Sequence, residues 1–111
     1  MLPLLVALAA DPCLDKATTD TDMRACVQAD YEREDARLNT AYKALTAKID
    51  AEARAILKKA QLAWIAFRDA NCAWEEDKFR GGTLGRLEYV ACLHAMTKAR
   101  ADDLEARLKL E

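Results

Sequence analysis

The sequence predicts an all-α fold: a small three-helix antiparallel bundle with two disulfides. Apolar residues recur at spacings of three and four in three long stretches, which is typical of amphipathic helices, and no alternating strand pattern is present. The 111 residues include only 3 glycines and 2 prolines, so turns must be few and helices long. The 4 cysteines form an even set in a short chain, which favours disulfides and an oxidising compartment.

The first ten residues, MLPLLVALAA, resemble the apolar core and cleavage region of a secretory signal peptide. This run is too short for a transmembrane helix. A buried first helical turn is the alternative, and it is less favoured because the run ends at Asp11 and Pro12. We therefore expect residues 1–10 to be a signal-peptide remnant and residues 11–111 to form the helical domain, which would be periplasmic or secreted.

The first helix is predicted from Thr21 to Lys48. Threonine and aspartate residues just before and within its first turn can cap it and complement the helix dipole. Its apolar line is close to a seven-residue repeat and comprises Met23, Val27, Tyr31, Leu38, Ala41, Leu45 and Ile49.

The second helix is predicted to begin after Asp50, which is a suitable N-cap, and to end by Phe79. Without glycine or proline before Asp50, one long bent helix is the alternative. We expect Trp64 and Phe67 to lie in the core and Trp74 to be partly exposed. The whole apolar line comprises Ala53, Leu57, Ala60, Trp64, Phe67 and Trp74.

The third helix is predicted from Leu84 to Leu110, with Thr83 as its cap. The strongest turn signal in the chain, Arg80-Gly81-Gly82-Thr83, comes directly before it. Its apolar positions are Leu84, Leu87, Val90, Ala91, Ala95, Met96, Ala99, Leu104 and Leu108.

The cysteine positions restrict the disulfide pairing. If the last turn centres near Gly82, Cys72 and Cys92 lie at one level on adjacent antiparallel helices, as a disulfide requires. Cys13 and Cys26 could then tie the N-terminal segment to the first helix. We favour these local pairs, while Cys26–Cys72 with Cys13–Cys92 stays open. A metal site is disfavoured because no two cysteines are closely spaced and the chain has 1 histidine.

A specific set of residues carries a family resemblance. The segment from Gln61 to Cys72 places Gln61, Trp64, Arg68 and Cys72 along one side of a helix. The other matching positions are Leu38, Asn39, Tyr42, Asp69, Gly81, Gly82, Thr97 and Arg100. Together with the four cysteines, this order resembles the lysozyme inhibitor LprI-like domain. The resemblance implies a small helical bacterial domain, secreted or envelope-anchored, and inhibition of lysozyme.

The polar residues of this signature have two interpretations. Gln61 and Arg68 could bind a ligand. We favour a structural role instead, because buried polar groups must find partners and long side chains can fix the register of neighbouring helices. The expected polar lattice comprises Asn39, Tyr42, Gln61, Arg68, Asp69, Thr97 and Arg100.

The residues do not suggest an enzyme. The chain lacks serine, which excludes a serine-based triad, and His94 lies two residues from Cys92 on another helix face. A formal net charge of −2 is too balanced for a dedicated nucleic-acid binder. We expect no catalytic residue, cofactor or metal, and no nucleic-acid partner.

The leading hypothesis is a protein that inhibits a c-type lysozyme by occluding its cleft with the turn between the last two helices. The acidic run Glu75-Glu76-Asp77 could face the basic surface of lysozyme, although an ordinary solvated helix end is the alternative. The expected contact residues are Glu75, Glu76, Asp77, Arg80, Gly81, Gly82 and Thr83. A non-catalytic envelope adaptor, holding another protein in an apolar groove, is the other hypothesis.

Overall fold

The computed structural model describes residues 12–111, so the leader expected at residues 1–10 lies outside the described part. Four helices make up this part: α2 (Pro12–Lys16), α3 (Asp20–Lys48), α4 (Ala51–Asp77) and α5 (Gly85–Leu108). The all-α prediction is confirmed, but the count of three is wrong because it omits the short α2. Proline is favoured at the first position of a helix, where its missing N–H has no partner to lose, and α2 begins in this way.

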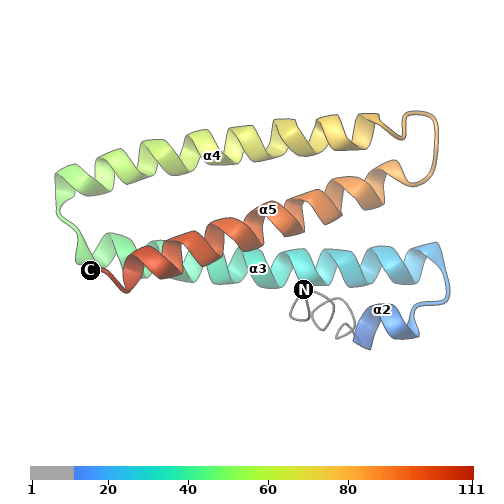
Figure 1. Ribbon diagram of the computed structural model, residues 1–111, viewed down its shortest axis with the longest axis horizontal. Coiled ribbons are helices and arrows are strands. Elements are labelled where there is room, and N and C mark those ends of the chain that lie inside the picture. Colours follow the sequence, from blue (N-terminus) through green and yellow to red (C-terminus); the bar gives the residue numbers. More distant parts are fainter. Residues whose placement is uncertain (1–11) are drawn as a thin grey trace, which may run out of the picture.

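The three long helices are arranged around α5. Figure 1 shows α5 running between α3 and α4, and its packing against α3 is the more extensive of the two. The molecule is elongated, with extents of 49 × 32 × 24 Å. Because α4 packs mainly on α5, much of its surface has no neighbour in the described chain.

Local side-chain caps set the starts of α3 and α4. Thr19 Oγ1 accepts a hydrogen bond of 3.0 Å from the backbone N–H of Asp22, so α3 begins one residue before the predicted Thr21. Asp50 Oδ1 accepts one of 2.9 Å from the N–H of Ala53, which confirms the predicted cap. Ile49 has an extended backbone between the two helices, so a single bent helix is excluded.

The prediction that Thr83 caps the third helix is wrong. Leu84 occupies the N-cap position of α5, and no side chain caps this end. The reason is a close approach between helices: Gly85 is buried, and a Cβ there would lie 3.3 Å from the carbonyl oxygen of Glu76. α5 therefore begins at Gly85, where the missing side chain lets the two helices approach closely. The main-chain oxygen of Thr83 instead accepts a bond of 3.4 Å from Arg24.

The apolar core lies mainly between α3 and α5. Its buried members are Leu38, Ala41, Leu45, Ala101 and Leu104. Trp64 is partly buried against this cluster, as expected. Phe67 was predicted in the core and is instead 61% exposed, while Trp74 is exposed. The buried residues of α4 are Gln61 and Cys72 only, because α4 contacts α5 along a narrow line and does not close against α3.

Two disulfides join the helices in pairs. Cys13 of α2 is bonded to Cys26 of α3, with Cα atoms 5.7 Å apart, and Cys72 of α4 to Cys92 of α5, with Cα atoms 5.4 Å apart. These are the two local pairs that the helix register favours. All four cysteines are therefore oxidised. Within residues 12–111, no helix combines the length and apolar character needed to cross a membrane.

Candidate functional site

The exposed turn between α4 and α5 forms one end of the bundle (Figure 1). Backbone hydrogen bonds continue from the end of α4, with the N–H of Phe79 donating to Glu76 at 3.0 Å and that of Gly82 to Phe79 at 2.9 Å. Gly81 has a φ of +82°, in the left-handed region where glycine carries no penalty, and no atom lies within 4 Å of where its Cβ would be. The tip of the turn is therefore narrow and free of side chains at this point.

An open hollow of about 420 Å³ lies beside the turn. Its lining residues are Ala73, Glu76, Asp77, Phe79, Arg80, Gly81, Gly82, Thr83, Gly85 and Arg86. Six of the expected contact residues thus surround one surface. The seventh, Glu75, lies instead on a neighbouring hollow with Asn71 and Glu88.

Each carboxylate of the acidic run lies near a cation. Lys78 Nζ is 3.0 Å from a carboxylate oxygen of Glu75, and the guanidinium of Arg80 is 2.6 Å from Asp77. The third cation, Arg86, comes from α5 and is 4.0 Å from Glu76. The turn end is consequently a mixed-charge surface rather than a bare acidic patch. Two of these pairs join residues three positions apart and are readable from the sequence, whereas the pairing of Glu76 with Arg86 depends on how the two helices meet.

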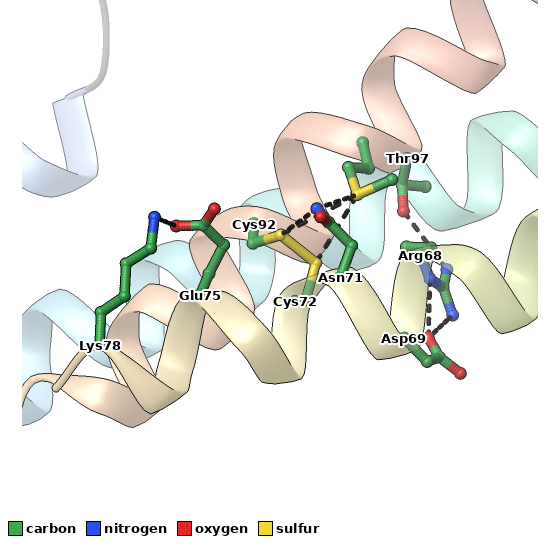
Figure 2. The surroundings of a disulfide bond; sticks show 9 residues. Arg68, Asp69, Asn71, Cys72, Glu75, Lys78, Cys92 and Thr97 are labelled. Atoms are coloured by element: carbon green, nitrogen blue, oxygen red, sulfur yellow. Dashed lines mark hydrogen bonds and ion pairs between the residues drawn. A yellow bond between two sulfur atoms is a disulfide. The ribbon is translucent and has the colours of Figure 1, made fainter. Parts of the chain in front are cut away.

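Several polar signature residues lie between α4 and α5: Gln61 and Thr97 are buried, and Arg68 and Arg100 are partly buried. Arg100 Nε donates to Oε1 of Gln61 at 3.0 Å, and Arg68 donates to Thr97 Oγ1 at 3.4 Å. Figure 2 shows Arg68 reaching both Thr97 on α5 and Asp69 beside it on α4. These contacts join α4 to α5 through hydrogen bonds, as the predicted polar lattice requires.

Aromatic rings extend the same network. The guanidinium carbons of Arg68 and Arg100 lie 5.2 and 5.9 Å from the ring centre of Trp64, within the range of cation–π attraction. Arg68 also lies 5.9 Å from the ring of Tyr31, and partial burial raises the pKa of this phenol. Two predicted members do not join this network: Asn39 is exposed, because it faces away from α5, and Tyr42 packs on the apolar core.

The second disulfide is enclosed by α4 and α5. Cys72 is fully buried, and Asn71 Nδ2 lies 3.3 Å from the thioether sulfur of Met96 beside it (Figure 2). Cys92 is only partly buried, but its sulfur is bonded to that of Cys72, so this disulfide serves as a structural crosslink. It holds α4 on α5 just before the turn end begins.

The chain matches the sequence model of one family, described as lysozyme inhibitor LprI, over residues 13–104. It belongs to the lysozyme inhibitor LprI family. The match begins at Cys13 and ends at Leu104, so it contains both disulfides, the polar network and the exposed turn. No solved structure matches the chain.

Two relatives of the LprI-family chain are themselves uncharacterised. A protein of Rhizobium meliloti is 31% identical over 108 residues, covering 86% of this chain and 78% of the relative. The protein YecT of Escherichia coli is 29% identical over 104 residues, covering 78% of this chain and 64% of YecT. The chain thus spans less than two thirds of the length of YecT.

One polar cluster escaped the sequence analysis. Arg37 on α3 lies 2.7 Å from Glu34, 2.7 Å from Asp102 and 2.6 Å from Glu105, so it links α3 to α5. These hydrogen bonds raise the pKa of Arg37, and the hydrogen bond from Arg37 lowers that of Asp102. Arg37 lies in a charged stretch of α3, among Glu32, Arg33, Glu34 and Asp35. No pattern along one helix shows which arginine the carboxylates of another helix will meet.

The described side chains offer a surface for binding and no evident site for metal chemistry. Among residues 12–111, no group of three or more histidine, cysteine, aspartate or glutamate side chains is placed to hold a metal ion. What the arrangement provides is a rigid, crosslinked base and a projecting turn with charges of both signs.

Proposed function

We propose that this chain is a secreted or periplasmic protein that inhibits a c-type lysozyme by placing its α4–α5 turn in the substrate cleft. The family match over residues 13–104 supports lysozyme as the target. The exposed turn, with Gly81 in the left-handed conformation and the Cys72–Cys92 disulfide joining the two helices before it, supports the choice of surface. The two disulfides are consistent with a compartment outside the cytoplasm.

Arg80 is the residue with the best chemistry for this role. Lysozyme cleaves its substrate with a pair of carboxylates inside the cleft. A guanidinium binds carboxylates through charge-assisted, bidentate hydrogen bonds. The side chain of Arg80 is 81% exposed at the turn, and its present partner is Asp77. On binding, Arg80 would exchange this solvated partner for a lysozyme carboxylate, while Gly81 and Gly82 let the backbone come close.

The inhibitor acts by occlusion and needs no cofactor or catalytic residue of its own. The mixed charges around the turn set its orientation on lysozyme more than its affinity, since exposed ion pairs contribute little free energy. Glu75, Glu76 and Asp77 would face the basic rim of the cleft while Arg80 enters it. Thr83 would contact lysozyme from the other side of the turn.

A lysis assay tests the function. The oxidised protein is titrated against c-type lysozyme on bacterial cell walls, beside a sample that has been reduced and alkylated. We expect dose-dependent inhibition that is lost on reduction, because α4 is then no longer fixed to α5. Full lysozyme activity at a large molar excess of oxidised protein would contradict the proposal and leave the adaptor hypothesis in its place.

Two charge variants test the surface. We expect Arg80→Glu to raise the inhibition constant by about tenfold or more, because the variant loses one charge-assisted hydrogen-bonded pair with lysozyme. Arg33→Glu is the matched control, because Arg33 on α3 is 70% exposed and pairs with an aspartate three residues earlier, as Arg80 does. Equal effects of the two changes would contradict the assignment of the turn.

Reversal of the acidic run tests its orienting role. A variant with lysine at positions 75, 76 and 77 should bind a basic lysozyme more slowly at low salt, since steering acts on the association rate. Association kinetics that do not change at low ionic strength would remove Glu75, Glu76 and Asp77 from the proposed contact.

A further inference from the structure

A continuous apolar stripe on α4 has no partner within the described chain. It comprises Ile56, Ala60, Ala63, Phe67, Ala70 and Trp74, all of them exposed. The three large side chains are 64%, 61% and 62% exposed at Ile56, Phe67 and Trp74. Scattered exposed apolar residues are ordinary, but a row of them on one side of a helix indicates an interaction surface.

The spacing of the stripe alternates between four and three residues, which is the repeat of helices that pair side by side. An α-helix turns by about 100° per residue, so the six positions lie on one side of α4. Gln61, Arg68 and Cys72 face α5, and they lie roughly a third of a turn around the helix from the stripe. In Figure 1, α4 lies at the edge of the bundle, so a second helix can approach it. From Ile56 to Trp74 the stripe is about 27 Å long.

The order of residues along the stripe is symmetric about Ile65. Its members stand two, five and nine positions to either side of this residue. An antiparallel copy of α4 centred there would place Ile56 opposite Trp74, Ala60 opposite Ala70, and Ala63 opposite Phe67. The ring of Phe67 then meets a small side chain, and every apolar position meets another. A two-fold interface requires this self-complementarity, because each residue meets its partner twice.

The charges of α4 select the same orientation. Its first part carries Arg54, Lys58 and Lys59, and its last part carries Glu75, Glu76 and Asp77. Antiparallel pairing brings opposite charges together, whereas parallel pairing would stack like charges. Glu52 and Lys78 stand at equal distances from Ile65 and on the side of the stripe, so antiparallel pairing brings this acid and this base together.

We infer that α4 is the interface of a homodimer, in which two copies pair antiparallel along the stripe and are centred near Ile65. The partner is a second copy of this chain, because both the spacing and the charge pattern are self-complementary. The two α4–α5 turns then point in opposite directions. Residues 80–83 lie beyond the end of the stripe, so the dimer displays two copies of this part of the turn. This inference does not depend on what the turns bind.

Sedimentation equilibrium of the full oxidised chain over a range of concentrations is the first test. We expect a reversible monomer–dimer equilibrium, and Phe67→Glu should weaken the dimer by about tenfold or more, because a charge would be buried against Ala63. Leu62→Glu is the matched control: Leu62 lies on the same helix, is 58% exposed and stands outside the stripe. Circular dichroism checks that both variants stay helical, and Ala63→Glu repeats the test.

A zero-length crosslinker that joins lysine to carboxylate tests the orientation. We expect a link from Glu52 to Lys78. Along one straight helix this pair is about 39 Å apart, so the link must join two copies. A purely monomeric chain up to about 1 mM would overturn the inference. So would equal weakening by Phe67→Glu and Leu62→Glu, or crosslinks between equivalent ends of α4.

Discussion

The side chain of Arg100 on α5 donates a hydrogen bond of 3.0 Å to Oε1 of Gln61 on α4. Gln61 is 8% exposed, and it is one of only two buried residues of α4. Apolar packing holds α3 against α5. On α4, which has few buried residues, this hydrogen bond supplies part of the corresponding stabilisation. Together with the Cys72–Cys92 disulfide, it fixes α4 to α5 and so places the projecting turn.

Removal of this contact should destabilise the fold. In Arg100→Met, the carbonyl oxygen of Gln61 keeps its buried position and loses its donor, which costs about 1–3 kcal/mol. Urea unfolding of the oxidised protein measures the change. Arg107→Met is the control, because Arg107 is exposed and, among the described residues, lies within salt-bridge distance only of Asp103. A loss no greater than that of the control would contradict the bracing role.

The two disulfides should contribute unequally. Each closes a short loop, with sequence separations of 13 and 20, and each is expected to stabilise the fold by roughly 2–4 kcal/mol. Replacement of Cys72 and Cys92 by alanine should cost more than replacement of Cys13 and Cys26. The reason is that Cys72 is fully buried and α4 has little other packing.

Denaturant unfolding of the two double variants, beside the unmodified protein, measures the difference. A larger loss for the pair Cys13 and Cys26 would mean that α2 and its crosslink matter more to the core than the packing indicates.

Stability should fall in acid partly through Asp102. The hydrogen bond from Arg37 lowers the pKa of this carboxyl in the folded state. The stabilisation that ionised Asp102 provides is therefore complete above the pKa that this carboxyl has in the unfolded chain. It is lost as the pH falls through the lower pKa of the folded state. Because Asp102 is 53% exposed, we expect at most about 1 kcal/mol.

Asp102→Asn tests this linkage. The variant should be less stable than the unmodified protein at pH 7, and the two should converge between about pH 5 and pH 2. Thermal unfolding across that range provides the comparison, with Glu32→Gln on the exposed side of α3 as the control. A gap that stays constant with pH would mean that charge on Asp102 is not its cause.

Gly81 should be required because its backbone conformation disfavours other residues. A larger side chain at this position would meet no steric clash. Its φ is +82° and no atom would crowd a Cβ, so Gly81→Ala should cost about 1 kcal/mol through conformation alone. Gly81→Asn should cost less, because asparagine tolerates the left-handed region better than alanine. A lower free energy of unfolding for Gly81→Asn than for Gly81→Ala would contradict this explanation.

Local chemistry in the sequence determined most of the helical framework. The cap at Asp50 forms between residues three positions apart, so its partner is readable from the chain. The apolar line of α3 became the core at Leu38, Ala41 and Leu45 because this side of α3 packs against α5. The short α2 was missed, since five residues are too few for a periodic pattern.

Only the tertiary structure decided which surfaces meet. Phe67 and Trp64 belong to the same apolar line, yet α5 covers only one flank of α4, so Trp64 is partly buried and Phe67 is exposed. Arg86 and Arg37 pair with carboxylates on other helices. The spacing of residues along one helix does not predict such pairs. The sequence by itself determined the helices and favoured the disulfide pairs, because these depend on local contacts and register. The burial of α4 and the pairing of Glu76 with Arg86 depend on the distance and angle between helices.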